Sequence, residues 1–315
     1  MTPGLVLILS ENWTLFDPRD LGALVDAAVE AEAAGFDGVM VSEHVVLGRG
    51  ADELGRPSNP REYALPGNQD PETPWPDPFT LLAAIASRTT RLRVIASAVI
   101  APLRHPLALA KQIATLDLLS GGRLVVQPTV SWHRAEYDAL GVPFARRGIL
   151  LDEHLAAWRS AWAASPAAYA GEAYAFEDVF LEPKPVRAEG PPLWFGGESL
   201  HPRHLRRLVE YGSGFNPLGS PSDDDLDRLR RALLAARRDP AAFELVGGAR
   251  GRFKGPDAAA DLDEALAGVP AQVARGFRTI CIKPSQFVDD ASDFSAFCRR
   301  AIDRVNALTA QITSN

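Results

Sequence analysis

Cysteine is nearly absent from this sequence: Cys281 and Cys298 are the only two among 315 residues. Two thiols cannot form the disulfide framework that stabilises small secreted proteins, so we expect both to be reduced. The sequence also lacks an apolar run of the roughly 18 residues that a membrane span requires. Its first residues, MTPGLVLILSENW, lack the basic segment and the long apolar stretch of a signal peptide. We therefore expect a soluble cytoplasmic protein without a membrane partner.

An excess of positive charge is absent as well. The formal net charge is −7, and Lys and Arg are spread along the chain rather than clustered. A nucleic-acid-binding surface needs a basic patch, so we expect no nucleic-acid partner. Hydrophobic residues make up 46% of the sequence, which is enough for a sizeable core.

Short apolar, β-branched runs alternate with longer segments of helical periodicity, and this alternation is typical of an α/β fold. The run LRVIASAVIA at 92–101 is apolar throughout, as a parallel strand covered on both faces should be. Asp17 and Pro18 form a typical N-cap and first helical residue, so we predict that the first helix begins there. We predict strands at 5–10, 38–44, 92–101, 123–130, 192–197, 214–218, 243–250 and 278–284.

Eight β-α repeats in one chain predict a (β/α)8 TIM barrel, whose active site lies at the carboxyl ends of the strands. No Pro-, Gly- or Ser-rich linker divides the chain, so we expect a single domain over residues 1–315. The segment 46–78 is rich in Pro and Gly and has no periodicity. Long loops inside compact domains are often functional, so this segment is a candidate lid; the alternative is a surface insertion without a function.

The residues at the strand ends restrict the chemistry. The first strand ends in ILSEN and lacks the His-x-His of a metal-dependent amidohydrolase, and we expect no metal. A glycosidase needs two carboxylates at strand ends, and this class remains open because the sequence offers Glu11, Glu43 and Glu198. Lys283 is the only strand-end lysine for a Schiff base, although a solvated or anion-pairing lysine is the more ordinary interpretation. Gly196 and Gly197 leave backbone N–H groups free for an anion, or they serve an ordinary tight turn.

Three segments resemble a known family. The segment TTRLRVIASAVIAPLRHPLALAKQIATLDLLSGGRLVV resembles the central signature of the luciferase-like monooxygenase superfamily, the bacterial-luciferase-type barrels. The segments WHRAEYDALGVPFARRGILLDEHLAAWRSAW and FLEPKPVRAEGPPLWFGGES are similar to that family's next two blocks, in the same order. The resemblance extends from Ala23 to about Pro217, is most specific at 102–123, and is closest to the branch of oxidoreductases that depend on coenzyme F420.

The resemblance implies a luciferase-like barrel with insertion loops at the strand carboxyl ends. It also implies a reduced flavin-type cofactor, coenzyme F420 or alternatively FMN, and a small-molecule substrate. We further expect a homodimer.

The resemblance also implies roles for residues of the second and third strands. His44 stands where family members keep a histidine that faces the reactive edge of the cofactor, and an imidazole there can donate or accept a proton. Glu43 occupies a cofactor-binding position at which F420 enzymes often carry Asp. Ala98 and Val99 fall where the family has a bulged strand with a non-prolyl cis peptide, and Ala101 follows beside the cofactor.

At the fifth strand, Gly196, Gly197 and Ser199 match the family's loop for the cofactor phosphate. Glu198 stands where a neutral residue is usual, and a carboxylate there would repel a phosphate unless it points away, so we do not assign it to the site.

The largest departure from the family lies after the fourth strand. The family usually has Gly-x-Gly-x-Gly there, whereas this sequence has QPTVS at 127–131 and no glycine. The hydroxyls of Thr129 and Ser131 could bind the cofactor around Val130, and Trp132 and His133 then stand where an acid or a substrate-stacking group is expected.

These features predict an oxidoreductase that transfers a hydride between coenzyme F420 and a small organic substrate. One alternative is an FMN-dependent monooxygenase that inserts one oxygen atom. The other is a non-catalytic barrel that binds a flavin or another ligand, which the missing glycines of the fourth strand favour.

Overall fold

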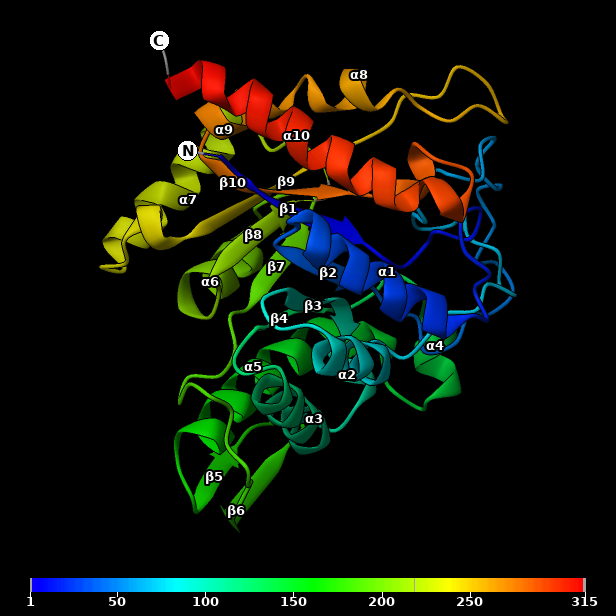
Figure 1. The fold of residues 1–315 in the computed structure, drawn as a ribbon. Helices are drawn as coiled ribbons and strands as arrows, with labels where there is room; N and C mark the ends of the chain where they lie inside the picture. Colours follow the sequence, from blue (N-terminus) through cyan, green and yellow to red (C-terminus); the bar gives the residue numbers. More distant parts are fainter. Residues whose placement is uncertain (1, 218, 314–315) are drawn as a thin grey trace.

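Eight parallel strands form a nearly closed barrel with helices on its outer face (Figure 1). The computed structural model describes residues 2–217 and 219–313. The strand order is β4-β3-β2-β1-β10-β9-β8-β7, so the predicted α/β barrel is confirmed. Each predicted strand is present to within a few residues at its ends, although residue 218 of the predicted strand 214–218 lies outside the described residues. The strands are β1 (Gly4–Ile8), β2 (Gly38–Val41), β3 (Arg93–Ile100), β4 (Leu124–Thr129), β7 (Trp194–Gly197), β8 (Gly214–Pro217), β9 (Glu244–Ala249) and β10 (Phe277–Ile282).

The barrel closes through one short contact. The N–H of Val126 in β4 donates at 3.0 Å to the carbonyl of Pro192, two residues before β7. A second weak seam lies between β8 and β9, where pairing is limited to Gly214 with Glu244 and Phe215 with Leu245. The other strand pairs of the barrel share three or more register partners.

Alternating side chains divide the core into two shells, as expected for strands whose side chains have a period of two. A small inner cluster fills the barrel and includes Val6, Met40, Val246 and Cys281. The larger outer shell packs the sheet against the helices. The helices are α1 (Leu21–Ala34), α2 (Pro78–Arg88), α3 (Pro106–Leu119), α4 (Arg134–Ala139), α5 (Arg147–Ala163), α6 (Pro202–Glu210), α7 (Asp223–Ala235), α8 (Leu262–Leu266), α9 (Val269–Ala274) and α10 (Phe294–Thr313).

The start of the first helix corrects the sequence prediction. Helix α1 begins at Leu21, and the side chain of Asp20, not Asp17, accepts the capping hydrogen bond from the N–H of Ala23. Asp17 instead accepts from the N–H of Arg19 in a local turn. Asp and Pro favour turns as much as helix starts, which explains the error.

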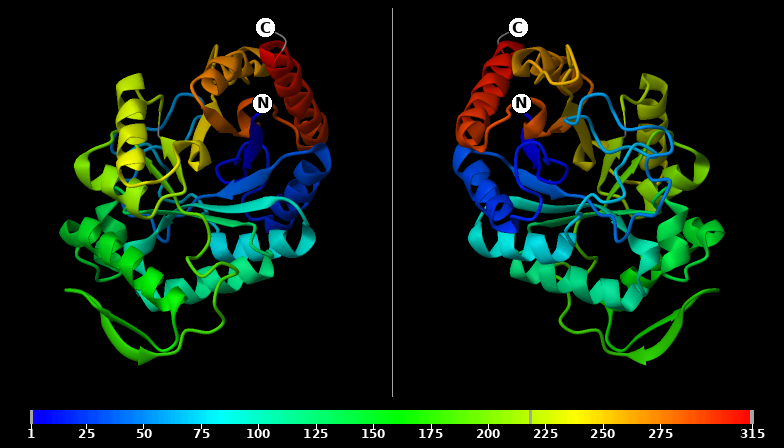
Figure 2. Two further views of the ribbon diagram at one scale, coloured as in Figure 1. Left: turned by 90° about the vertical axis from the view of Figure 1, so that its left-hand side faces the viewer. Right: turned by 90° about the vertical axis from the view of Figure 1, so that its right-hand side faces the viewer.

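Two features lie outside the barrel repeat. A hairpin of β5 (Ala167–Ala170) and β6 (Ala175–Val179) extends away from the barrel (Figure 2). Helix α10 packs beside α1, which brings the two ends of the described chain to the same side of the molecule (Figures 1 and 2). None of the helices in residues 2–217 and 219–313 is long and apolar enough to cross a membrane.

Strand β3 has an irregularity at the predicted place. The register with β4 passes from Ser97–Gln127 directly to Val99–Pro128, so Ala98 has no partner. The cis peptide joins Ser97 to Ala98, one residue before the expected position.

Candidate active site

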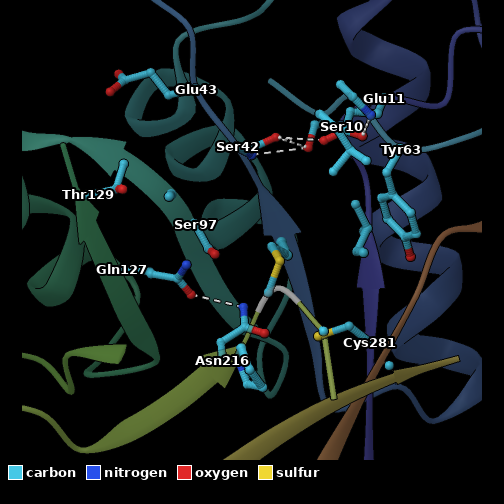
Figure 3. Close-up of a pocket in the computed structure, with 18 of the residues that line it drawn as sticks. Ser10, Glu11, Ser42, Glu43, Tyr63, Ser97, Gln127, Thr129, Asn216 and Cys281 are labelled. Carbon is cyan, nitrogen blue, oxygen red and sulfur yellow. Dashed lines mark hydrogen bonds between the residues drawn. The ribbon is translucent and has the colours of Figure 1, made fainter. Parts of the chain in front are cut away.

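A cavity of about 550 Å³ opens at the carboxyl ends of the barrel strands. This volume is within the range of small-molecule sites in proteins. Figure 3 shows polar side chains of β3, β4 and β8 around it (Ser97, Gln127, Thr129 and Asn216), Ser10 and Ser42 just beyond the ends of β1 and β2, and Cys281 below them. The residues that were expected in the site and line this cavity are Glu43, His44, Ala98, Thr129, Ser131 and Trp132. Those that do not are Val99, Ala101, Val130, His133, Gly196, Gly197 and Ser199.

His44 is held by a carboxylate that the sequence did not identify. Its Nδ1 lies 3.2 Å from Oε2 of Glu136, a residue of α4 with no exposed surface. The N–H of Val45 donates to Oε1 of Glu136 at 2.8 Å, and the hydroxyl of Ser131 donates to Oε2 at 3.2 Å. A carboxylate only accepts hydrogen bonds, so Nδ1 carries the hydrogen and Nε2 is left for a ligand.

Two tryptophans flank the imidazole of His44. Trp75 lies 5.2 Å away and Trp132 6.0 Å away between ring centroids, both in edge-to-face geometry. Both tryptophans line the cavity, so the free edge of His44 lies in a largely aromatic wall. Aromatic walls exclude water, and they strengthen the electrostatic effect of the few polar groups that remain.

His133 lies behind this wall. Its Nε2 accepts a hydrogen bond from the N–H of Gly48 at 2.7 Å, and its ring is tilted against Trp132 at 4.7 Å between centroids. Burial lowers the pKa of His133, which keeps the ring neutral and able to accept. The contacts of His133 therefore hold the loop after β2, and its side chain does not line the cavity.

Glu43 lines the cavity but turns its carboxylate to one side (Figure 3). Both of its oxygens bind the guanidinium of Arg104, and Oε2 also accepts from the N–H of Ile100 at 2.8 Å. A carboxylate engaged in this way joins the end of β2 to the end of β3. Its role toward a cofactor remains a prediction.

The end of β4 has one free hydroxyl. Thr129 makes no side-chain hydrogen bond within residues 2–217 and 219–313, and it lines the cavity. Ser131 has a left-handed backbone, with a φ of 56°, and its hydroxyl is engaged by Glu136. Deeper in the barrel, Gln127 accepts a hydrogen bond from Asn216 at 2.9 Å (Figure 3). Thr129 is therefore the β4 hydroxyl that is available to a cofactor.

Close packing leaves no room for a side chain at the two glycines of β7. A Cβ on Gly197 would lie 2.8 Å from Cε1 of His204, and the φ of Gly197 is 153°. A Cβ on Gly196 would lie 2.5 Å from Nε2 of Gln127. Helix α6 begins close by, and the imidazole of His204 is fixed by the carbonyl of Ser199 at 2.9 Å. The phosphate role of this loop remains a prediction.

The loop 46–78 contributes Tyr63, Leu65, Gln69 and Trp75 to the cavity, and it contains no strand or helix before α2 begins at Pro78. The barrel rim holds this loop through buried groups. Its lid function remains a proposal.

Glu11 and Lys283 make two of the contacts that hold the loop. Oε2 of Glu11 accepts from the N–H of Ala64 at 2.9 Å, and Nζ of Lys283 donates to the carbonyl of Glu62 at 2.8 Å. Lys283 has no exposed surface and lies 3.7 Å from Glu11. Burial lowers the pKa of Lys283, but its Nζ is occupied by the loop and does not line the cavity. These contacts give Lys283 a structural role.

The residues 2–217 and 219–313 contain no group of His, Cys, Asp and Glu arranged to hold a metal. Cys281 lines the cavity, and burial raises the pKa of its thiol to about 12, so it is not a reactive thiolate.

Comparison with known proteins extends these observations. A family model described as "Luciferase-like monooxygenase" matches residues 3–278. An uncharacterized protein of Mycobacterium tuberculosis is 36% identical over 168 residues, which are 52% of this chain and 58% of that relative. The chain thus spans less than two thirds of the length of the curated relatives that it matches first.

Two solved structures share the fold. An F420-dependent secondary alcohol dehydrogenase in complex with an F420-acetone adduct has a TM-score of 0.71 at 15% identity, over 97% of this chain and 99% of that chain. The oxygenating constituent of 3,6-diketocamphane monooxygenase from Pseudomonas putida, in complex with FMN, has a TM-score of 0.72 at 15% identity, over 97% and 98%. At this identity the likeness shows the fold alone.

Proposed function

The chain belongs to the luciferase-like monooxygenase family, and we propose that it is an oxidoreductase that transfers a hydride between coenzyme F420 and a small organic substrate. The observation that carries this proposal is the pairing of His44 with the buried Glu136 at the wall of the cavity. Transfer of a hydride to or from a carbonyl or alcohol needs a proton donor or acceptor at the oxygen atom, and an imidazole held by a carboxylate supplies one.

The cavity fits a flavin-type ring. It has about 550 Å³ of space, apolar walls from Ile8 and Met40, and the free hydroxyl of Thr129. In this proposal Thr129 donates a hydrogen bond to the cofactor and the apolar walls hold its ring. A bound deazaflavin would supply the two-electron half of the reaction.

The protein supplies the proton half. Nε2 of His44 takes a proton from a substrate hydroxyl, or gives one to a substrate carbonyl oxygen. Glu136 keeps the imidazole in the tautomer that leaves Nε2 free, and its negative charge stabilises the imidazolium when the proton arrives. Trp75 and Trp132 exclude water from this edge.

Replacement of His44 by Ala tests this role. We expect turnover to fall about 100-fold, as is typical for the loss of a general acid or base, while the cofactor dissociation constant changes little. The measurement is the absorbance of oxidised F420 with a panel of secondary alcohols, together with a binding titration of the same variant. An unchanged rate would remove His44 from the mechanism.

The second candidate is an FMN-dependent monooxygenase. It is favoured by the family description and by the FMN-bound structural neighbour. Formation of an oxygenated substrate with reduced FMN and oxygen, together with no hydride exchange between F420 and the substrate panel, would favour it. A non-catalytic flavin-binding barrel is the third candidate, favoured by the absence of glycine at 127–131; flavin binding without turnover of any substrate in the panel would favour it.

A further inference from the structure

The barrel wall is open on one side. Strands β8 and β9 pair only through Phe215 and the residues before it, yet β8 continues to Pro217 and β9 to Ala249. On its other edge β9 stays paired with β10 up to Ala249. Among residues 2–217 and 219–313, the edge of β9 that faces β8 is therefore without a strand partner from Val246 onward.

A side chain takes the place of the missing strand. Gln272 of α9 accepts a hydrogen bond from the N–H of Gly248 at 3.2 Å and donates to the carbonyl of Gly248 at 3.0 Å. A carboxamide has one acceptor and one donor group, so it satisfies both backbone groups of one residue. One carboxamide is much smaller than a strand, so it pairs with the backbone groups of Gly248 but leaves the space between β8 and β9 unfilled.

The cavity passes through this gap. Gly248 is the register partner of Cys281, whose side chain belongs to the inner cluster, and both residues line the cavity. Gly247 points to the opposite face, where an added Cβ would overlap the carboxamide of Gln272, and it also lines the cavity. Phe277, a residue of the outer shell, does so too. The cavity therefore has a branch that leaves the barrel interior between β8 and β9. We call it the side branch.

The side branch has apolar groups along part of its wall, and it ends at a cation. Its walls include the backbone of the two glycines, Pro217 and the ring of Phe277, together with the carboxamide of Gln272. At its outer end Arg275 donates to Asp223 at 2.8 Å, to the hydroxyl of Ser220 at 3.2 Å and to one backbone carbonyl. A guanidinium has five N–H donors, so two of them make no hydrogen bond to residues 2–217 and 219–313. The side chain is 28% exposed, whereas its partner Asp223 is 84% exposed and easily displaced.

We propose that the side branch binds an unbranched aliphatic chain of the substrate, with a terminal carboxylate at Arg275. Glycine backbone places no side chain across the gap, so a methylene chain can pass between β8 and β9. Arg275 offers a fork of donors that matches a carboxylate. The proposal rests on the proposed function only in calling this ligand a substrate, because its binding can be measured without a cofactor.

Gly248 faces the barrel interior at the inner mouth of the side branch, so a side chain there would block entry to the branch. A Cβ there would meet only the carbonyl oxygen of Cys281, at an ordinary 3.5 Å, and the backbone of Gly248 is not left-handed. Gly248→Leu therefore adds a side chain to open space without backbone strain. Gly255→Leu is the matched control, because Gly255 also has open space around its Cβ but lies outside the cavity.

The probes are straight-chain carboxylates from butanoate to decanoate and the alcohols of the same length, titrated by calorimetry into the cofactor-free protein. For the wild type and for Gly255→Leu we expect affinity to rise about fourfold per methylene until the branch is full. We expect the long carboxylates to bind about tenfold more tightly than the matching alcohols. Gly248→Leu should keep the affinity for butanoate and lose about 30-fold for decanoate.

Arg275→Gln should bring each carboxylate to the affinity of its alcohol and leave the alcohols unchanged. Equal chain-length dependence in wild type and Gly248→Leu, or no chain-length dependence in the wild type, would overturn the proposal. Flavin titrations of the same proteins separate the two claims. Normal flavin binding without chain binding refutes the side branch alone, and chain binding without flavin binding refutes the proposed function alone.

Discussion

Replacement of Glu136 by Gln tests the arrangement on which the proposed chemistry depends. Glu136 has no exposed surface, and both of its oxygens accept hydrogen bonds. Glutamine has nearly the same volume but only one acceptor oxygen. Because the backbone N–H of Val45 can only donate, the amide oxygen should stay there and the amide nitrogen should face His44.

This exchange reverses the hydrogen bond to the imidazole. The amide N–H₂ donates, so Nδ1 of His44 must lose its hydrogen and Nε2 must carry it toward the cavity. The hydrogen bond to the negative charge is also lost, and such a bond contributes about 1.5–3 kcal/mol. We therefore expect kcat/KM to fall by about 10- to 150-fold. The loss should lie mainly in kcat, and the pH profile should change shape, because a neutral group now holds the ring.

The assay is steady-state turnover of a secondary-alcohol substrate between pH 5 and 9, with flavin titration and thermal unfolding of the same protein. Asp138→Asn is the matched control: Asp138 lies on the same helix, two residues further on, and is exposed. It makes the same chemical change at the surface and should leave kcat/KM unaltered. Wild-type kcat/KM in Glu136→Gln would refute the reasoning. So would a loss of flavin affinity and thermal stability that accounts for the whole drop in rate.

Three further predictions concern other parts of the site. Thr129→Val, which removes one hydroxyl at constant shape, should weaken flavin binding by about 0.5–1.5 kcal/mol in a fluorescence titration; an unchanged dissociation constant would show that Thr129 does not bind the cofactor. Gly197→Ala should lower the thermal unfolding midpoint because its Cβ would lie 2.8 Å from His204. Gly197→Asp should weaken flavin binding beyond the effect of Gly197→Ala only if the loop holds the phosphate. Equal flavin dissociation constants for the two variants would place the phosphate elsewhere. Burial lowers the pKa of His133, His154 and His204, so the folded state disfavours their protonation. The contribution of these histidines to the free energy of unfolding should therefore be complete above about pH 6.5 and should decrease as the pH drops below it. Unfolding midpoints measured from pH 8 to pH 5 should decline less steeply in His133→Gln, and an identical slope would exclude His133 as a source of the decline.

The barrel was predictable because its signal is local. Each strand is a short apolar run, and the alternation with helical segments needs no knowledge of distant residues. The start of α1 was missed because Asp17 and Asp20 both precede helical residues, and only the three-dimensional structure shows which side chain reaches the N–H of Ala23. The hairpin β5–β6 was missed because its exposed, alanine-containing strands have no apolar alternation.

The candidate site was predictable in part. His44 could be placed in it because it closes a strand, and the structure puts it at the cavity wall. Glu136 could not be assigned to it, because it stands 92 residues away in a short helix whose burial is not visible in the sequence. For the glycines of β7 the sequence suggested a phosphate loop, and this role stays a prediction; the structure adds that a Cβ at either position would crowd His204 or Gln127.

The side branch had no signal in the sequence. Gly247 and Gly248 occur in a run that predicts an ordinary strand, and Gln272 is a single polar residue on a short helix. The gap exists because β8 and β9 separate after Phe215, which is a property of the tertiary structure.

The most direct test of the proposed function is a titration of the purified protein with oxidised coenzyme F420 and with oxidised FMN, side by side, followed by tryptophan quenching. Trp75 and Trp132 line the cavity and should report binding of either ring. We predict saturable one-to-one binding of F420, at least about tenfold tighter than that of FMN, which corresponds to about 1.4 kcal/mol. Tighter binding of FMN, or no binding of either cofactor, would contradict the proposal.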